Sequence, residues 1–127
     1  MASKAKILVV EDEPGLVEVL EVNLRASGYD VVAASDGLEA LRRFDEEKPD
    51  LVTLDLNMPT VSGFRLLRLF KSDPRPTPVV VITGYSFEEA EEVAHAGADD
   101  FITKPIDFVQ LISKIERALA KYKGGSA

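Results

Sequence analysis

Five short apolar runs recur along the chain, and each is continuous rather than alternating with polar residues. They lie at 7–10, 31–34, 51–54, 79–82 and 101–102. Continuous apolar runs of this length are typical of parallel strands that are covered on both faces. The pattern therefore predicts five strands of a parallel sheet.

Between and after these runs, apolar residues recur at the three- and four-residue spacing of amphipathic helices. The stripes are Leu16, Val17, Leu20 and Leu24; Leu38, Leu41 and Phe44; Phe64, Leu67 and Phe70; Phe87, Ala90, Val93 and Ala94; and Phe108, Leu111, Ile112, Ile115 and Leu119. A strand–helix unit is thus repeated five times. This order predicts an α/β fold, a single doubly wound (βα)5 parallel sheet with helices on both faces and right-handed crossovers.

Residues that start or end helices agree with this division. Proline suits a first helical position, a capping residue with Glu three positions later forms a capping box, and glycine commonly ends a helix. These signals are Pro14, the pairs Asp36–Glu39 and Ser86–Glu89, and the glycines Gly28 and Gly97. We expect residues 4–122 to form one folded domain, with flexible tails at 1–3 and 123–127.

Composition narrows the class of protein. The 127 residues include no cysteine and one histidine, His95, which excludes a disulfide scaffold, a thiolate metal site and a multi-histidine metal cluster. Fifteen basic and 22 acidic residues give a net charge of −7, which argues against direct binding to nucleic acid or to an anionic membrane. No apolar run approaches the roughly 18 residues of a membrane span and no signal peptide is apparent, so a cytoplasmic location is expected.

Residues that can do chemistry follow the predicted strands. In an open α/β sheet, ligands bind beyond the carboxyl ends of the strands. The polar residues at those positions are Glu11, Asp12, Asp55, Thr83 and Lys104. Close carboxylates oppose one another's ionisation, so this cluster needs a cation, and an all-oxygen set of ligands suits Mg²⁺. Lys104 would then serve a second anion, and a phosphoryl group on Asp55 is the natural candidate because aspartate can act as a nucleophile.

Each of these residues alone has a simpler interpretation. Glu11 and Asp12 could cap the following helix, and Lys104 could be a solvated loop lysine. Asp55, however, stands between two leucines, where an unpaired carboxylate is costly. The joint placement of these residues at one sheet edge favours a functional site.

Four segments at these positions carry a family resemblance: 7–14, 55–59 with Gly63 downstream, 81–84 and 97–105. In this order they resemble the receiver domain of bacterial response regulators, the chemotaxis regulators among them, over nearly the whole chain. The resemblance implies a flavodoxin-like sheet with strand order 2-1-3-4-5. It also implies a phosphorylation-activated signalling switch in a two-component system.

The resemblance implies a metal and phosphoryl site at the first two acidic residues and the third strand. Asp55 would accept a phosphoryl group from a sensor histidine kinase or a phosphotransfer protein, in a Mg²⁺-dependent reaction. Glu11 and Asp12 would hold Mg²⁺ together with Asp55 and the backbone carbonyl of Asn57.

The resemblance also implies how the state of the site reaches the surface. Thr83 would bond the phosphoryl group, Lys104 would pair with it, and Phe101 would be the switch aromatic. The Lys104–Pro105 bond is expected to be cis. An output domain or a second copy of the chain is expected to meet the face formed by residues 86–122.

The sequence also departs from the family pattern. Phe101 stands where tyrosine is frequent, so output recognition would rest on shape alone. The predicted helix over residues 86–96 has no Lys or Arg, which argues against a salt-bridged dimer through it. Tyr85 could shield the phosphoryl group from water. Outside the site, the basic stripe of Arg65, Arg68 and Lys71 is expected to be solvated.

Three other functions remain open. An aspartyl phosphatase would carry a general acid two residues after its nucleophile, where this chain has Asn57. A flavin-binding electron carrier would want a loop rich in Ser, Thr and Gly after the first strand, where this chain has acidic residues. A receiver-like scaffold would never turn over phosphate, and the complete set of acidic, hydroxyl and ammonium groups argues against it.

Overall fold

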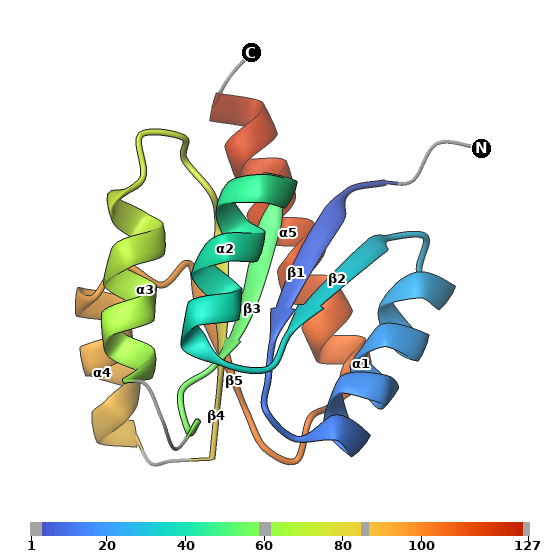
Figure 1. Ribbon diagram of the computed structural model, residues 1–127, viewed down its shortest axis with the longest axis horizontal. Coiled ribbons are helices and arrows are strands. Elements are labelled where there is room, and N and C mark those ends of the chain that lie inside the picture. The colour runs from blue at the N-terminus through green and yellow to red at the C-terminus, as the bar shows by residue number, and fades with distance from the viewer. Residues whose placement is uncertain (1–3, 59–61, 85–86, 126–127) are drawn as a thin grey trace.

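Strands and helices alternate along the chain in the computed structural model, which describes residues 4–58, 62–84 and 87–125 (Figure 1). The strands are β1 (Lys6–Val10), β2 (Asp30–Ala34), β3 (Leu51–Asp55), β4 (Val79–Thr83) and β5 (Asp100–Thr103). The helices are α1 (Pro14–Ala26), α2 (Gly37–Glu47), α3 (Gly63–Ser72), α4 (Phe87–His95) and α5 (Phe108–Gly125). Each predicted strand and helix is therefore confirmed.

The strands form one parallel sheet in the order β2-β1-β3-β4-β5, as the resemblance implied. The inner strands β3 and β4 are buried along their whole length, whereas the edge strands β2 and β5 are partly exposed. This difference follows from position, because an inner strand has neighbours on both sides and helices on both faces. All carboxyl ends lie at one edge of the sheet, at the bottom of Figure 1.

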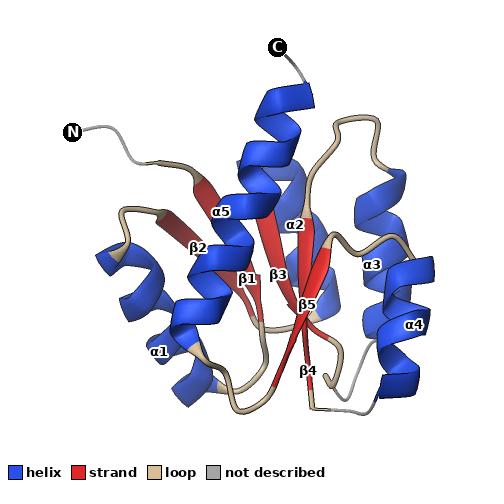
Figure 2. Cartoon of the chain, turned by 180° about the vertical axis from the view of Figure 1, so that it is seen from behind, coloured by secondary structure: helices blue, strands red, loops and turns tan. Residues whose placement is uncertain are grey.

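Helices cover both faces of the sheet, and a hydrophobic core lies under each layer. Helices α2, α3 and α4 lie on one face, whereas α1 and α5 lie on the other (Figures 1 and 2). Residues of β3 alternate between the layers, with Val52 and Leu54 in the first core and Leu51 in the second. The helices packed on the two faces of the sheet therefore hold the ends of the strands in place.

The helix boundaries confirm most of the predicted signals. Pro14 begins α1, and the Asp36 side chain accepts a hydrogen bond from the Glu39 backbone N–H at 2.8 Å. Gly28 and Gly97 have φ values of 95° and 100°, a region that glycine adopts readily. The expected cap at Ser86 lies outside the described residues.

Two predicted core positions are wrong. Leu38 is 81% exposed, because the face of α2 that contacts the sheet runs through Gly37, Ala40 and Phe44. Ala94 is also exposed, since it lies about 100° around α4 from the buried Val93. In α2 the buried face includes Gly37 and Ala40, which the predicted stripe left out, whereas in α4 the predicted Val93 does face the core.

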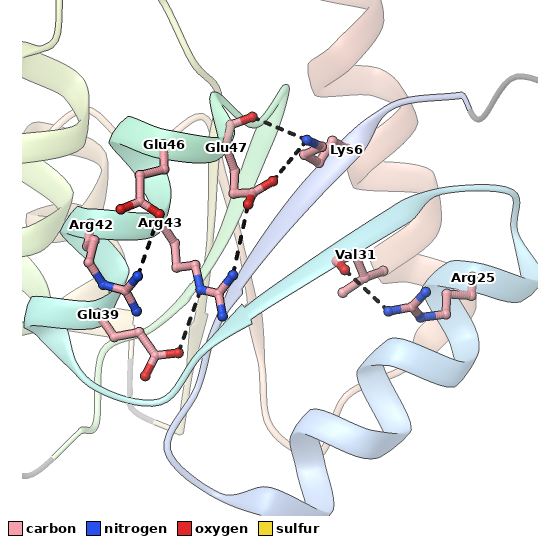
Figure 3. Close-up of polar contacts among 8 residues, drawn as sticks. All are labelled: Lys6, Arg25, Val31, Glu39, Arg42, Arg43, Glu46 and Glu47. Atoms are coloured by element: carbon pink, nitrogen blue, oxygen red, sulfur yellow. Dashed lines mark hydrogen bonds and ion pairs between the residues drawn. The ribbon is translucent and has the colours of Figure 1, made fainter.

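Charged side chains near β1, β2 and α2 pair with one another (Figure 3). The ion pairs are Lys6–Glu47 at 3.0 Å, Arg42–Glu46 at 3.5 Å, and Arg43–Glu39 and Arg43–Glu47 at 3.9 Å. Arg25 donates to the carbonyl oxygen of Val31 on the edge strand β2 at 3.2 Å. Partly exposed ion pairs of this kind each contribute little to the stability of the fold. The basic and acidic side chains in these ion pairs are equal in number, so their charges balance.

Candidate functional site

The carboxyl ends of neighbouring strands bring the predicted site residues together. Glu11 follows β1, Asp55 ends β3, Thr83 ends β4 and Lys104 follows β5. Lys104 Nζ donates a hydrogen bond to Asp55 Oδ2 at 3.0 Å, across the end of β4. Residues 49 positions apart in the sequence therefore meet at one edge.

Three carboxylates converge beside this ion pair. Glu11, Asp12 and Asp55 each place one carboxylate oxygen within 4.8 Å of the other two. Glu11 and Asp55 are only 1% exposed, and Asp12 is more exposed. One ammonium, that of Lys104, faces three carboxylates, so the site carries excess negative charge.

Backbone groups hold two of these carboxylates in place. The N–H of Asn57 donates to Asp55 Oδ1 at 2.8 Å, so Lys104 and Asn57 occupy one oxygen of Asp55 each. The N–H of Glu13 donates to Glu11 Oε2 at 3.2 Å. Glu11 Oε1 is buried without a hydrogen-bond partner. A buried, unpartnered carboxylate oxygen is costly, and it fits a site for a hard cation such as Mg²⁺.

Electrostatics favour the same interpretation. Burial, and after it the neighbouring Asp55 carboxylate, raise the pKa of Glu11 to about 8. Burial alone would lower the pKa of Lys104, but the hydrogen bond and charge of Asp55, together with the charges of Glu11 and Glu13, outweigh burial and raise it. Lys104 therefore stays charged, while Glu11 takes up a proton where no cation offsets its charge.

A cavity of about 340 Å³ adjoins the acidic residues. It is lined by Glu11, Asp12, Pro14, Val17, Glu18, Glu21 and Ser35. Asp55 is not among the lining residues, so the cavity lies on the side of the cluster formed by Glu11 and Asp12.

Three further predicted residues surround the cluster. Thr83 is 1% exposed, and its carbonyl accepts the Lys104 backbone N–H at 2.8 Å. The Asn57 side-chain nitrogen lies 3.4 Å from the place a Cβ on Gly84 would take, so the amide reaches the end of β4. Phe101 is half-buried against the core under α2, α3 and α4.

The register between β4 and β5 places Thr83 and Phe101 on the same face of the sheet. Phe101 pairs with Val81, and Thr83 lies two positions beyond Val81 on the same face of β4. The Lys104–Pro105 bond is cis, as expected. Tyr85 lies outside the described residues.

Sequence reasoning missed one contribution to the site. It gave Asn57 a backbone carbonyl role, whereas the structure shows that its N–H orients the Asp55 carboxylate. The available signal was an aspartate two residues earlier, because Asp side chains commonly bond to the backbone two positions on.

Comparisons with known proteins agree with this geometry. Residues 7–116 match the family described as the response regulator receiver domain. PhoP of Bacillus subtilis, an alkaline phosphatase synthesis transcriptional regulatory protein, is 38% identical over 118 residues, which cover 91% of this chain and 49% of PhoP. The response regulator PleD of Caulobacter vibrioides is 41% identical over 122 residues, which cover 94% of this chain and 27% of PleD.

Solved structures show the same likeness. The receiver domain of a LuxO repressor protein from Vibrio parahaemolyticus has a TM-score of 0.90 at 28% identity, covering 96% of this chain and 95% of that one. NtrX from Brucella abortus has a TM-score of 0.90 at 35% identity, covering 99% of this chain and 29% of NtrX.

The chain belongs to the response regulator receiver domain family of two-component systems. It spans about half the length of PhoP and about a quarter of PleD. Within the part of the chain that the structure describes, no helix is long and apolar enough to span a bilayer.

Proposed function

We propose that this chain is a phosphorylation-activated switch in which Asp55 accepts a phosphoryl group with Mg²⁺ bound beside it. The donor is a phosphohistidine of a sensor kinase or of a phosphotransfer protein. One observation carries the proposal: a buried Asp55 carboxylate contacts Lys104 and lies within 4.8 Å of Glu11 and Asp12. The nucleophilic carboxylate of Asp55, a group of carboxylates suited to a cation and the Lys104 ammonium therefore lie next to one another.

The transfer needs little from the protein beyond orientation and charge. An oxygen of Asp55 forms a bond to phosphorus as the nitrogen–phosphorus bond of the donor breaks, and the leaving imidazole keeps that electron pair. The Asn57 N–H holds the nucleophilic carboxylate in place. Lys104 moves its hydrogen bond from Asp55 to an oxygen of the arriving phosphoryl group.

The carboxylates of Glu11, Asp12 and Asp55, with the backbone carbonyl of Asn57, would hold Mg²⁺. When bound, Mg²⁺ offsets the negative charge of the carboxylates and of the phosphoryl oxygens. The unpartnered Oε1 of Glu11 supports this assignment. Because carboxylates outnumber ammonium groups in the site, they repel an anionic phosphoryl donor, and a bound cation reduces this repulsion.

We expect Thr83 and Phe101 to pass the phosphorylation state of Asp55 to the protein surface. A phosphoryl group on Asp55 adds strong hydrogen-bond acceptors, and we expect the Thr83 hydroxyl to turn toward them. The apolar Phe101 ring on the same sheet face then moves inward. Fluorine NMR of a fluorinated Phe101, with and without beryllofluoride, tests this step, and Thr83→Ala should accept phosphate without the change. An identical signal in both states of the wild type would contradict the coupling.

The remaining expectations belong to the same proposal. The domain spans residues 4–122, works in the cytoplasm, and passes its state to an output domain or a second copy through the face formed by residues 86–122. The relative PhoP is named as a transcriptional regulator, which supports an output domain rather than direct binding of nucleic acid by this acidic chain.

The acceptor is tested by incubating the protein with acetyl phosphate and Mg²⁺ and measuring its intact mass. The wild type should gain one phosphoryl group, and Asp55→Asn should gain none. Asp45→Asn makes the same chemical change at an exposed position on α2 and should be labelled like the wild type. Equal labelling of Asp55→Asn would overturn the proposal and favour a scaffold that carries no phosphate on this residue.

A further inference from the structure

A second lysine–aspartate pair lies at the opposite, amino edge of the sheet. Lys71 Nζ, at the end of α3, donates to Asp99 Oδ2 at 2.9 Å, to Tyr122 Oη at 2.6 Å and to the Thr77 carbonyl at 3.1 Å. The Tyr122 hydroxyl donates to Asp99 Oδ1 at 2.9 Å, which closes a ring of three side chains. We call these three residues the Lys71 triad.

The Lys71 triad is sheltered from solvent. The exposed fractions of the Lys71 and Asp99 side chains are 20% and 9%, so the expectation that Lys71 is solvated is wrong. Its stem runs past Gly97, where an added Cβ would lie 3.3 Å from Lys71 Cγ. Its ammonium lies 5.2 Å from the centre of the Tyr122 ring. Reduced solvent screening makes each of these contacts stronger than its surface equivalent.

The Lys71 triad joins the last turns of α5 to the sheet. Asp99 immediately precedes β5, and its Oδ2 also accepts the Val79 N–H at the start of β4, at 2.7 Å. The Asp99 N–H donates to the Val79 carbonyl at 2.9 Å. Tyr122 therefore fixes the end of α5 to the beginnings of two neighbouring strands.

Strand β5 connects the Lys71 triad directly to the phosphoacceptor site. Asp99 precedes its first residue and Lys104 follows its last, which places the two about 17 Å apart at a rise of roughly 3.3 Å per residue. One short strand thus begins beside the aspartate that holds Tyr122 and ends beside the lysine that holds Asp55. As an edge strand, β5 is paired to β4 alone.

We propose that the Lys71 triad passes the state of Asp55 to the last turns of α5, an inference that rests on the proposed function. When Lys104 exchanges Asp55 for a phosphoryl oxygen, the carboxyl end of β5 shifts with it. A strand bonded on one side can shift as a unit, and Asp99 then carries Tyr122 along. The phosphoryl group can move the end of α5 only because the contacts of Lys104 differ between the unphosphorylated and the phosphorylated state of Asp55.

The same strand and helix offer a matched control. Lys114 of α5 pairs with Asp100 of β5 at 3.0 Å, but the exposed fractions of these side chains are 25% and 26%. The Lys114 ammonium lies 5.9 Å from the centre of the Phe101 ring, but among the described residues this pair closes no hydrogen-bonded ring with a third side chain. If any link between β5 and α5 were sufficient, removing Lys114 would weaken the coupling as much as removing the Tyr122 hydroxyl.

The test compares the amide signals of residues 118–122 by NMR, with Mg²⁺ alone and after addition of beryllofluoride. Fluorine NMR of the bound beryllofluoride reports occupancy of Asp55 separately. The wild type should show shift changes at 118–122, Lys114→Gln should retain them, and Tyr122→Phe should reduce them at least twofold at equal occupancy. Lys71→Met removes the triad from its other side and should have the same effect.

The outcomes separate the two proposals. Bound beryllofluoride with no change at 118–122 in the wild type, or with wild-type changes in both Tyr122→Phe and Lys71→Met, would overturn the inference alone. A wild type that binds no beryllofluoride would overturn the proposed function and this inference with it.

Discussion

The two edges of the sheet each hold a lysine–aspartate pair of nearly the same length. Lys104 and Asp55 are 3.0 Å apart at the carboxyl edge, and Lys71 and Asp99 are 2.9 Å apart at the amino edge. Their surroundings differ. The first pair lies beside two further carboxylates, one with an unpartnered oxygen, whereas both oxygens of Asp99 accept hydrogen bonds.

This difference separates a binding site from a structural contact. At the carboxyl edge, the excess negative charge costs stability until a cation arrives, which is the condition for regulated binding. At the amino edge, one ammonium, one carboxylate and one hydroxyl satisfy one another. Removing a carboxylate should therefore stabilise the protein at the first edge, whereas removing either charge should destabilise it at the second.

The largest expected effect is at the amino edge. Lys71→Met should lower the free energy of unfolding by about 2–3 kcal/mol, because it leaves the largely buried Asp99 carboxylate without its cation. Urea denaturation measures the change. Lys114→Met, at a more exposed pair, should cost below about 1 kcal/mol. Equal losses in the two variants would contradict the contrast in burial.

The pH dependence of stability tests the carboxyl edge. Native Glu11 keeps its proton to a pKa of about 8, whereas in the unfolded chain it loses the proton near its ordinary value of 4.5. Between these values the native state binds more protons, so stability falls as pH rises. Without Mg²⁺ we expect a loss of roughly 2 kcal/mol between pH 5.5 and pH 8, which is part of this window.

Denaturation with urea at pH 5.5 and pH 8 measures this loss. Glu11→Gln should flatten the dependence, because an amide does not titrate. Saturating Mg²⁺ should also flatten it by stabilising the charged form. A wild type whose metal-free stability stays constant or rises over the same window would contradict the assignment to Glu11.

A smaller gain is expected at Asp12. Without metal, Asp12→Ala should raise the free energy of unfolding by about 1 kcal/mol, because it removes negative charge from an acidic cluster in which Lys104 offsets only one carboxylate. The same variant should weaken Mg²⁺ binding, since it removes a ligand. Thermal melts and calorimetric titration measure the two effects. Unchanged affinity for Mg²⁺ would count against Asp12 as a ligand.

The smallest effect concerns a polar group in the interior below the carboxyl edge. Thr53 is fully buried in β3, and its hydroxyl has no hydrogen-bond partner in the described part of the chain. Thr53→Val should therefore stabilise the protein by about 0.5–1 kcal/mol, measured by urea denaturation. Labelling of Asp55 should stay at the wild-type level, and a loss of labelling would show that the hydroxyl serves the site.

The sequence predicted the carboxyl edge better than the amino edge. The site residues at the carboxyl edge immediately end or follow strands, so local position was sufficient to bring them together. The partners at the amino edge are 28 and 23 residues apart and follow no local pattern. Arg65, Arg68 and Lys71 have the spacing of one exposed helix face, but Lys71 lies in the last turn of α3 beside Gly97, where a missing side chain leaves room for its stem.

The helix faces show a similar limit. Apolar spacing predicted that α2 exists, yet its stripe included the exposed Leu38 and left out the buried Ala40. The sheet contact is made by small residues, Gly37 and Ala40, which allow the helix to approach closely. Which stripe faces the sheet depends on the strand positions, and spacing within the helix does not contain that information.

The central claim is that the acidic excess at the carboxyl edge binds Mg²⁺ and that this binding makes Asp55 a phosphoacceptor. The most direct measurement is the intact mass of the wild type after incubation with acetyl phosphate over a series of Mg²⁺ concentrations. We predict that one phosphoryl group is added, that its occupancy rises with Mg²⁺ to saturation, and that a chelator abolishes it. Labelling that is equally complete without Mg²⁺, or that maps to a peptide lacking Asp55, would contradict the claim.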